Sequence, residues 1–382
     1  MTTRELRVSP IPRANYISNL SLDEVSGGWS GFNAAIYKSL SRHFKLDYVG
    51  PISPPPDGIA KVISKIHRTM GNRGSFPFFS RRRLESVSAE VRKQAGATAQ
   101  FDFFHGSTPW VAYEPAIPYA CYLDVCFATY MDIYHDRSEF EEADLKRIVR
   151  EETRWLERAD RVFFSSRWAL ERCAIEYKLS SDTFRVAGMG AYLPIPERDS
   201  FAGGHDFLFI ALDFDGKGGR VCADAFRIVR DECPDATLRV IGAQPPADVL
   251  DMPGVSYEGI LDKSVPADLE RLQHILATSF ALVHPTTRDA TPQVVIEAQY
   301  HGCPVVAPRS FGIPEMVVDT VTGCLVEAPP SALSFAERML WLVRNPVSYR
   351  RMRMAARANS IEHFTWAVVG DRIALEMMPV IT

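Results

Sequence analysis

Short apolar runs alternate with stretches of helical periodicity along most of the chain. Apolar residues recur three or four positions apart over residues 141–159, 220–233 and 333–345, as on one face of a helix. The short runs are rich in β-branched and aromatic residues, which is typical of buried parallel strands. They cover residues 101–104, 161–164, 207–211, 238–241, 280–283 and 303–307. This alternation predicts an α/β protein in which helices cover parallel sheets.

Prolines and glycines gather near the middle of the chain. They lie between residues 193 and 204, after one completed strand–helix unit and before a fresh strand. A chain of 382 residues is long for a single core, so we expect a domain over residues 1–197 and another over 198–364. We expect each domain to be Rossmann-like, with ligands bound beyond the carboxyl ends of its strands.

Two acidic residues, Asp289 and Glu297, stand in the most informative segment of the chain, residues 284–317. The apolar pattern predicts a helix that begins just after Pro292, so that Asp289 lies in the preceding loop and Glu297 lies on the helix. A second loop, around Gly312, opens another predicted helix. The first turn of a helix carries free backbone N–H groups that bind anions. The segment therefore predicts a pocket for a polyhydroxylated and phosphorylated ligand.

Charge and cysteine usage exclude several classes of function. The net charge is -4 and the pI is about 6.2, whereas a general nucleic-acid binder is expected to be basic. The cysteines show no zinc-type spacing and several lie in apolar runs, so we expect buried free thiols, no metal and no cofactor. With no bilayer-spanning run and no signal-type start, a cytoplasmic location is expected.

Residues 59–93 are basic within a chain that is acidic overall. Nine lysines and arginines face only two acids, Glu85 and Glu90, and an apolar helical pattern precedes a run of aromatic and arginine residues. One interpretation is peripheral contact with an anionic membrane surface. The alternatives are a solvated basic face and a loop that grips a phosphorylated acceptor.

The segment from His284 onward resembles the donor-binding half of family 4 retaining glycosyltransferases, the glycosyl transferases group 1, which have the two-domain GT-B fold. The motifs that carry this resemblance lie at residues 27–28, 159–166, 190–191, 207–211, 216–219, 235–242, 297–307, 312–315 and 319–326. It covers most of residues 15–50 and 100–380, and it is more specific in the carboxyl-terminal half. It also implies that the last segment, residues 365–382, forms a helix that crosses back to the amino-terminal domain.

The resemblance implies a set of donor-binding residues for a nucleotide diphosphate sugar. They are Gly27, Gly28, Lys217, Asp289, Thr291, Pro292, Glu297, Gly312, Ile313, Pro314 and Glu315. Lys217 would stabilise the departing diphosphate, Glu297 would accept hydrogen bonds from the ribose, and Asp289 would face the sugar. The alternatives are a solvated turn lysine for Lys217, a helix-dipole glutamate for Glu297 and an N-cap for Asp289. Glu315 either touches the sugar or a phosphate-bound water, or caps its helix.

The catalytic candidates are Lys217, Asp289, Asp124 and His105. The last two follow apolar runs, so we expect them at strand ends facing the cleft, where either side chain could orient an acceptor hydroxyl. In a retaining front-face mechanism the leaving phosphate can itself take the acceptor proton. The alternative for His105 is a core histidine.

One position departs from the family pattern. An arginine usually precedes the lysine by four or five residues and helps to hold the diphosphate, but this chain has Asp213 and Leu212 there. The candidates for a substitute cation are Arg220, Arg288 and Arg309.

The sequence thus predicts a retaining glycosyltransferase that moves a sugar from a nucleotide diphosphate sugar to an acceptor hydroxyl. The acceptor can be a glycan, a lipid-linked group or a small molecule. Two alternatives stand beside it: a nucleotide-sugar-binding protein with weakened catalysis, and a GT-B epimerase or phosphorylase.

Overall fold

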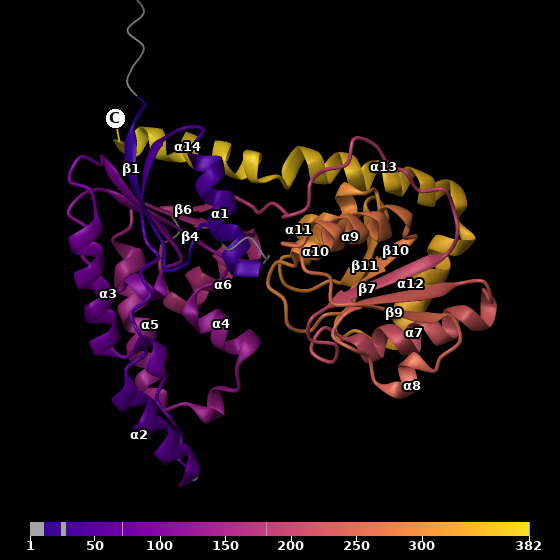
Figure 1. The fold of residues 1–382 in the computed structure, drawn as a ribbon, viewed down its shortest axis with the longest axis horizontal. Coiled ribbons are helices and arrows are strands. Elements are labelled where there is room, and N and C mark those ends of the chain that lie inside the picture. Colours follow the sequence, from indigo (N-terminus) through magenta and orange to yellow (C-terminus); the bar gives the residue numbers. More distant parts are fainter. Residues whose placement is uncertain (1–10, 24–27, 71, 181, 382) are drawn as a thin grey trace, which may run out of the picture.

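The computed structural model describes residues 11–23, 28–70, 72–180 and 182–381. Within these residues the chain forms two parallel sheets of six strands each, and helices flank both sheets (Figure 1). The predicted α/β class with two Rossmann-like sheets is therefore confirmed, as are the predicted strands and the helices over 141–159, 220–233 and 333–345.

The first sheet lies in the amino-terminal half and has the strand order β2-β1-β3-β4-β5-β6. Its strands are β1 (Arg13–Ile17), β2 (Lys45–Val49), β3 (Phe101–His105), β4 (Tyr119–Leu123), β5 (Arg161–Phe164) and β6 (Phe184–Val186). Its helices are α1 (Gly28–Leu40), α2 (Gly58–Thr69), α3 (Arg81–Gln94), α4 (Phe127–Tyr134), α5 (Glu142–Glu157) and α6 (Arg167–Tyr177), with 3-10 turns η1 (Pro77–Phe79), η2 (Thr108–Trp110) and η3 (Arg137–Glu139). Strands β3 and β4 are buried along their whole length because helices cover both faces of a parallel sheet.

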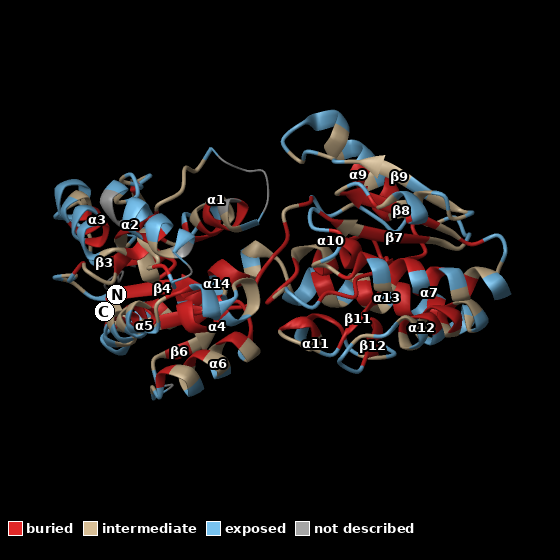
Figure 2. Ribbon diagram, turned by 90° about the horizontal axis from the view of Figure 1, so that it is seen from below, coloured by how far each residue is buried: buried red, intermediate tan, exposed pale blue. Residues whose placement is uncertain are grey.

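The second sheet lies in the carboxyl-terminal half and has the order β12-β11-β10-β7-β8-β9. Its strands are β7 (Asp206–Ala211), β8 (Thr237–Gly242), β9 (Val255–Gly259), β10 (Ala281–Val283), β11 (Val305–Pro308) and β12 (Gly323–Val326). Its helices are α7 (Gly219–Glu232), α8 (Ala247–Leu250), α9 (Pro266–Thr278), α10 (Gln293–Tyr300), α11 (Ile313–Met316), α12 (Ala332–Arg344) and α13 (Pro346–His363). Buried residues follow the strands and the inner faces of the helices in both halves (Figure 2).

The boundary that we predict at residues 197 and 198 falls between β6 and β7, in a segment without helix or strand. The last helix, α14 (Trp366–Ile381), returns to the first half and packs on α1 and β5 (Figure 1). Gly370 of α14 lies against Ser39 of α1, and the Ser39 hydroxyl donates a hydrogen bond to the Trp366 carbonyl. A side chain at position 370 would meet Ser39, so this glycine permits the close approach of the two helices.

The cysteines and the helices agree with two further expectations. All seven cysteines are free thiols, and all but the partly exposed Cys233 are buried. In the described part of the chain, no helix has the length and apolar character that crossing a bilayer requires.

Candidate active site between the two domains

Asp289 lies in the loop between β10 and α10, as the sequence predicts, and it forms an ion pair. Its carboxylate lies 2.6 Å from Lys217 Nζ and 3.5 Å from His284 Nε2. Burial would raise the pKa of Asp289, but the imidazole and the ammonium group outweigh burial and lower that pKa. The N-cap of α10 is Pro292, so the alternative of Asp289 as an N-cap is wrong.

Lys217 is held in the loop between β7 and α7 with its ammonium group directed at the Asp289 loop. Besides the Asp289 carboxylate, Lys217 Nζ donates to the Arg288 carbonyl at 2.6 Å. The lysine side chain is 23% exposed, which contradicts a solvated turn lysine. Gly218 has φ of +80°, and a Cβ there would strike the Pro285 carbonyl. Glycine at this position therefore lets the two loops approach closely.

Asp124 reaches Thr291 across the space between the domains. Asp124 follows β4, and its carboxylate accepts hydrogen bonds from the Thr291 hydroxyl and from the Ser165 hydroxyl, the latter at 2.8 Å. The two hydroxyl oxygens lie 3.1 Å apart. Burial raises the pKa of Asp124 to about 6, against the opposing effect of these hydrogen bonds. The loops beyond β4, β5 and β10 therefore meet at one buried polar contact.

Glu297 is buried on α10, and a lysine that the sequence reasoning missed neutralises it. Lys263 Nζ lies 2.5 and 2.8 Å from the two Glu297 carboxylate oxygens. Glu297 is 1% exposed and lies beyond the first turn of its helix, so the helix dipole alone does not account for its position. Lys263 follows β9 in a stretch without any local motif, and the only signal for it was its place beyond the carboxyl end of a strand.

The Gly312 loop closes over the Asp289 loop. Gly312 N donates to the Ala290 carbonyl at 2.9 Å, and a Cβ on Gly312 would meet the Thr291 side chain. Helix α11 begins at Ile313 with Pro314 in its first turn, as expected, although the helix is short.

Glu315 caps a helix of the other domain. Its carboxylate oxygens accept hydrogen bonds from the backbone N–H groups of Arg167 and Trp168, both at 2.8 Å, at the start of α6. The alternative that Glu315 caps its own helix is therefore wrong.

His105 lies at the end of β3 and is fully buried. Burial lowers the pKa of His105 to about 3, so its imidazole is neutral at pH 7. Neither ring nitrogen has a hydrogen-bond partner among the described residues, and the ring lies 4.1 Å from the ring of Trp29, centroid to centroid. This environment favours the alternative of a core histidine.

Of the glycine pair at the start of α1, only Gly28 lies within the described residues. Gly27 lies outside the described residues. Gly28 has φ of +59°. If a Cβ were added to this residue, no atom of the described residues would lie within 4 Å of it. Gly28 therefore leaves room for a ligand at the first turn of α1.

The three candidate substitute cations differ in what they already bind. Arg220 pairs with Asp248 at 2.5 Å, and Arg309 pairs with two acids, the nearer at 2.8 Å. Arg288 has no ion-pair partner among the residues that the structure describes. Asp213, in place of the usual arginine, accepts a hydrogen bond from the Gly216 N–H and so shapes the Lys217 loop.

Known proteins resemble this chain in sequence and in fold. Residues 204–345 match the family model described as glycosyl transferases group 1. Over 168 residues the chain is 29% identical to a GDP-mannose-dependent alpha-(1-6)-phosphatidylinositol monomannoside mannosyltransferase of Mycolicibacterium smegmatis, covering 41% of this chain and 44% of that protein. The chain thus spans less than half the length of this curated relative.

Two solved structures share the whole arrangement. A sucrose-phosphate synthase from Thermosynechococcus elongatus superposes with a TM-score of 0.68 at 15% identity, over 96% of this chain and 99% of that one. HepE of Anabaena in complex with UDP gives a TM-score of 0.65 at 17% identity, over 96% and 100%. The two-domain GT-B fold is thereby confirmed.

The raised pKa of Asp124 predicts a change in how stability depends on pH. The folded protein holds this proton up to about pH 6, whereas the ordinary carboxyl value is 3.8, so the Asp124 contribution to the free energy of unfolding falls as the pH rises between these values. Asp124→Asn should remove up to about 3 kcal/mol of this fall. Thermal unfolding at pH 4 and pH 7 should therefore show a smaller loss of Tm in the variant than in the wild type.

The exposed carboxylate of Asp224 provides the control, because among the described residues its one ion-pair partner is its surface neighbour Arg227. Asp224→Asn should keep the wild-type dependence of Tm on pH. An Asp124→Asn variant with the wild-type dependence would contradict the assignment.

Proposed function

Because residues 204–345 belong to the glycosyl transferases group 1 family, we propose that the protein transfers a sugar from a nucleotide diphosphate sugar to an acceptor hydroxyl with retention of configuration. The observation that carries the proposal is the convergence of Lys217, Asp289 and Glu297 at the carboxyl ends of one sheet, opposite Asp124 of the other sheet. The UDP bound by a structural neighbour, HepE, supports a nucleotide donor.

The donor would lie with its ribose at Glu297 and its diphosphate at Lys217. A carboxylate accepts hydrogen bonds from two ribose hydroxyls, and the ammonium group stabilises the charge that develops on the leaving diphosphate. Both groups are now paired with internal partners, Lys263 and Asp289, so donor binding would exchange these ion pairs for contacts to the ligand. Arg288, with its guanidinium unpaired among the described residues, is the best-placed substitute for the family's arginine.

The acceptor hydroxyl would approach from the side of Asp124. In a front-face mechanism the acceptor oxygen bonds to the anomeric carbon on the same face from which the phosphate departs. The departing phosphate takes the acceptor proton, so the step needs no strong protein base. The Asp289 carboxylate, ionised because its pKa is lowered, would face the positive charge that develops at the anomeric carbon. No metal is needed to neutralise the diphosphate in this arrangement, because Lys217, Arg288 and helix N-termini supply positive charge.

Lys217→Ala tests the role of the lysine on the leaving group. Turnover should fall roughly 100- to 1,000-fold, the scale for loss of one stabilising donor, while KM for the donor changes much less. Release of nucleoside diphosphate from a panel of UDP-, GDP- and ADP-sugars measures turnover, and calorimetry measures nucleotide binding.

Lys146→Ala is the matched control, because this surface lysine pairs with Glu142 along α5 and with no other acid in the part of the chain that the structure describes. Nucleotide binding without turnover of any donor in the wild type would contradict the enzyme and favour a nucleotide-sugar-binding protein.

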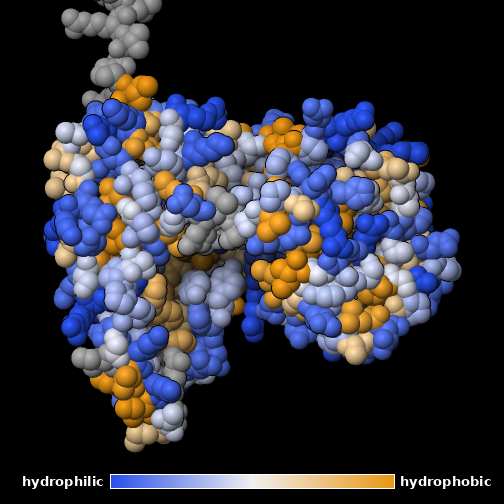
Figure 3. All heavy atoms as spheres, in the orientation of Figure 1, coloured by the Kyte–Doolittle hydropathy of each residue, from blue (hydrophilic) through white to orange (hydrophobic). Residues whose placement is uncertain are grey.

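We further propose that helix α2 brings the protein to an anionic membrane surface. Three apolar side chains of its outer face are exposed, Val62 at 59%, Ile63 at 47% and Ile66 at 49%, and Met70, directly after the helix, is 70% exposed. In Figure 3 apolar side chains gather at the end of the amino-terminal half where α2 lies in Figure 1. Exposed lysines and arginines flank them, namely Lys61, Lys65, Arg73, Arg81 and Arg82.

This combination matches an interfacial helix, in which apolar side chains enter the lipid boundary and cations meet anionic headgroups. Not every arginine of the segment contributes, because Arg83 is buried and donates to the Pro54 and Phe78 carbonyls. The free thiols of all seven cysteines support a reducing compartment, so we place this surface in the cytoplasm.

Ile66→Asp should weaken binding to vesicles that contain phosphatidylglycerol by tenfold or more. The change removes apolar area that would enter the lipid, and it adds a negative charge that the anionic headgroups repel. Vesicle flotation measures the bound fraction. Leu375→Asp is the control, since Leu375 is 75% exposed on α14 and away from α2. Equal binding to neutral and anionic vesicles, or an unaffected Ile66 variant, would refute membrane contact by α2.

A further inference from the structure

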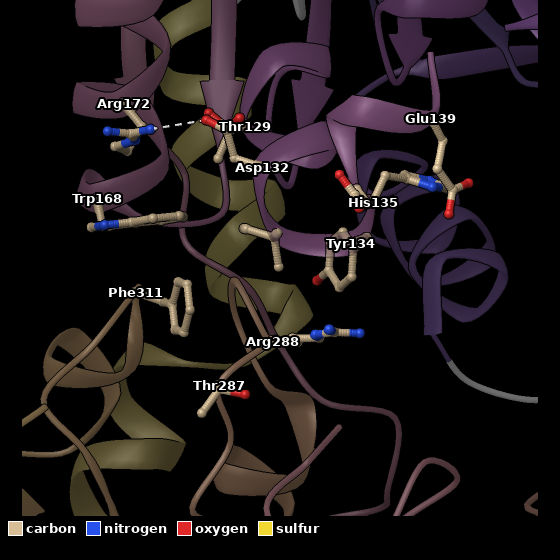
Figure 4. A pocket seen from close by; sticks show the side chains of 12 residues that line it. Thr129, Asp132, Tyr134, His135, Glu139, Trp168, Arg172, Thr287, Arg288 and Phe311 are labelled. Atoms are coloured by element: carbon tan, nitrogen blue, oxygen red, sulfur yellow. Dashed lines mark hydrogen bonds and ion pairs between the residues drawn. The ribbon is translucent and has the colours of Figure 1, made fainter. Parts of the chain in front are cut away.

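A cavity of about 820 Å³ lies between the domains, and its lining includes Thr287 and Arg288, which directly precede Asp289. Its amino-terminal wall comes from α4, η3 and α6, and its other wall comes from the loops that follow β10 and β11 (Figure 4). The volume falls within the range of about 300–1,000 Å³ that is typical of small-molecule sites.

One end of the cavity adjoins the proposed reaction centre. Arg288 lines the cavity, and the next residue along the chain is Asp289, the partner of Lys217. The Tyr134 hydroxyl accepts a hydrogen bond from the Ala290 N–H at 3.4 Å, which ties α4 to the same loop. A molecule in the cavity can therefore present one end to the bond that is made, while its remainder lies between α4 and α6.

Two aromatic rings from opposite domains form an apolar surface in the cavity. Trp168 of the α6 side and Phe311 of the β11 side have ring centroids 5.4 Å apart at 82° (Figure 4). The backbone of Trp168 is held by the Glu315 carboxylate, so the ring is placed by a contact between the domains. An aromatic face offers apolar contact to the C–H face of a sugar ring while leaving its hydroxyls free.

Carboxylates supply the polar part of the lining. Asp132, Asp136 and Glu139 line the cavity, but both Asp132 oxygens already accept hydrogen bonds, from Arg137 at 2.8 Å and from Arg172 at 3.3 Å. Asp136 and Glu139 are therefore the carboxylates that suit hydroxyl donors of a ligand. The three acids face two arginines, but Arg172 is already paired with Asp132 at 3.3 Å and with Glu176 at 2.6 Å. Three acids and two arginines leave the lining slightly acidic, which disfavours a phosphate or carboxylate ligand in the body of the cavity.

We infer that this cavity is the acceptor subsite and that it takes an uncharged glycoside, whose ring lies against Trp168 and whose hydroxyls donate to the carboxylates. This inference rests on the proposed function, because the cavity serves as an acceptor site only if sugar transfer occurs at Asp289. It names the acceptor class, which the donor site does not determine.

Matched ligands test the charge preference. Methyl α-D-glucopyranoside and methyl α-D-mannopyranoside are compared with glucose 1-phosphate and mannose 1-phosphate by saturation-transfer NMR, with and without UDP or GDP. Each neutral glycoside should bind at least tenfold more tightly than its phosphorylated counterpart. Trp168→Ala should weaken glycoside binding at least tenfold, Trp168→Phe should retain most of it, and both should leave nucleotide affinity unchanged.

The outcomes separate this inference from the proposed function. Tighter binding of the phosphorylated sugars, no binding of any neutral glycoside, or an unaffected Trp168→Ala variant would overturn the acceptor assignment. Loss of phosphorylated-sugar binding in Arg288→Gln would then identify an anion site instead. Failure of every nucleotide to bind would overturn the proposed function. In that case, glycoside binding measured without nucleotide would still show whether the cavity binds a neutral glycoside.

Discussion

The contact between Asp124 and Thr291 determines how the two sheets face each other. Asp124 follows β4 of the first sheet, and Thr291 precedes α10 of the second, so their hydrogen bond joins the carboxyl ends of both sheets. Ser165 completes the contact, and Glu315 strengthens it by capping α6 from the other domain. Because every strand pairing is parallel, loops that hold functional side chains gather at these facing edges.

The charges at this edge are arranged in pairs that a ligand can exchange. Lys217 lies against Asp289 and Lys263 lies against Glu297, so neither cation is left uncompensated in the absence of a donor. A buried charge without a partner is strongly destabilising, which explains why the residues proposed to bind phosphate and ribose hold each other. The same pairing means that the donor must offer each group a contact as good as the internal one.

The sequence predicted the fold well because its signals are local. Continuous apolar runs such as residues 207–211 have one favourable environment, a parallel strand covered on both faces. The loop before α10 was predicted for the same reason, since Pro292 and the apolar pattern after it define where that helix begins. The short α11 was also read correctly from Gly312 and Pro314.

Contacts between distant segments were not predictable in this way. Lys263 is separated from Glu297 by a helix and a strand, and only the packing of the second domain brings them together. The binding of Glu315 to the start of α6 requires both domains to be placed first. Burial likewise decides the state of His105, which a strand-end position alone does not reveal. The proposed membrane contact of residues 59–93 likewise depends on side-chain exposure, because Arg83 is buried while Val62 and Met70 are exposed.

We expect a bound nucleotide diphosphate to replace the internal partners of Lys217 and Glu297. A crystal structure with UDP or GDP, whichever binds more tightly, tests this directly. A diphosphate oxygen should lie within hydrogen-bond distance of Lys217 Nζ and ribose hydroxyls should lie on the Glu297 carboxylate, with Lys263 moved aside. A nucleotide bound elsewhere, with the Lys217–Asp289 and Lys263–Glu297 pairs unchanged, would contradict it.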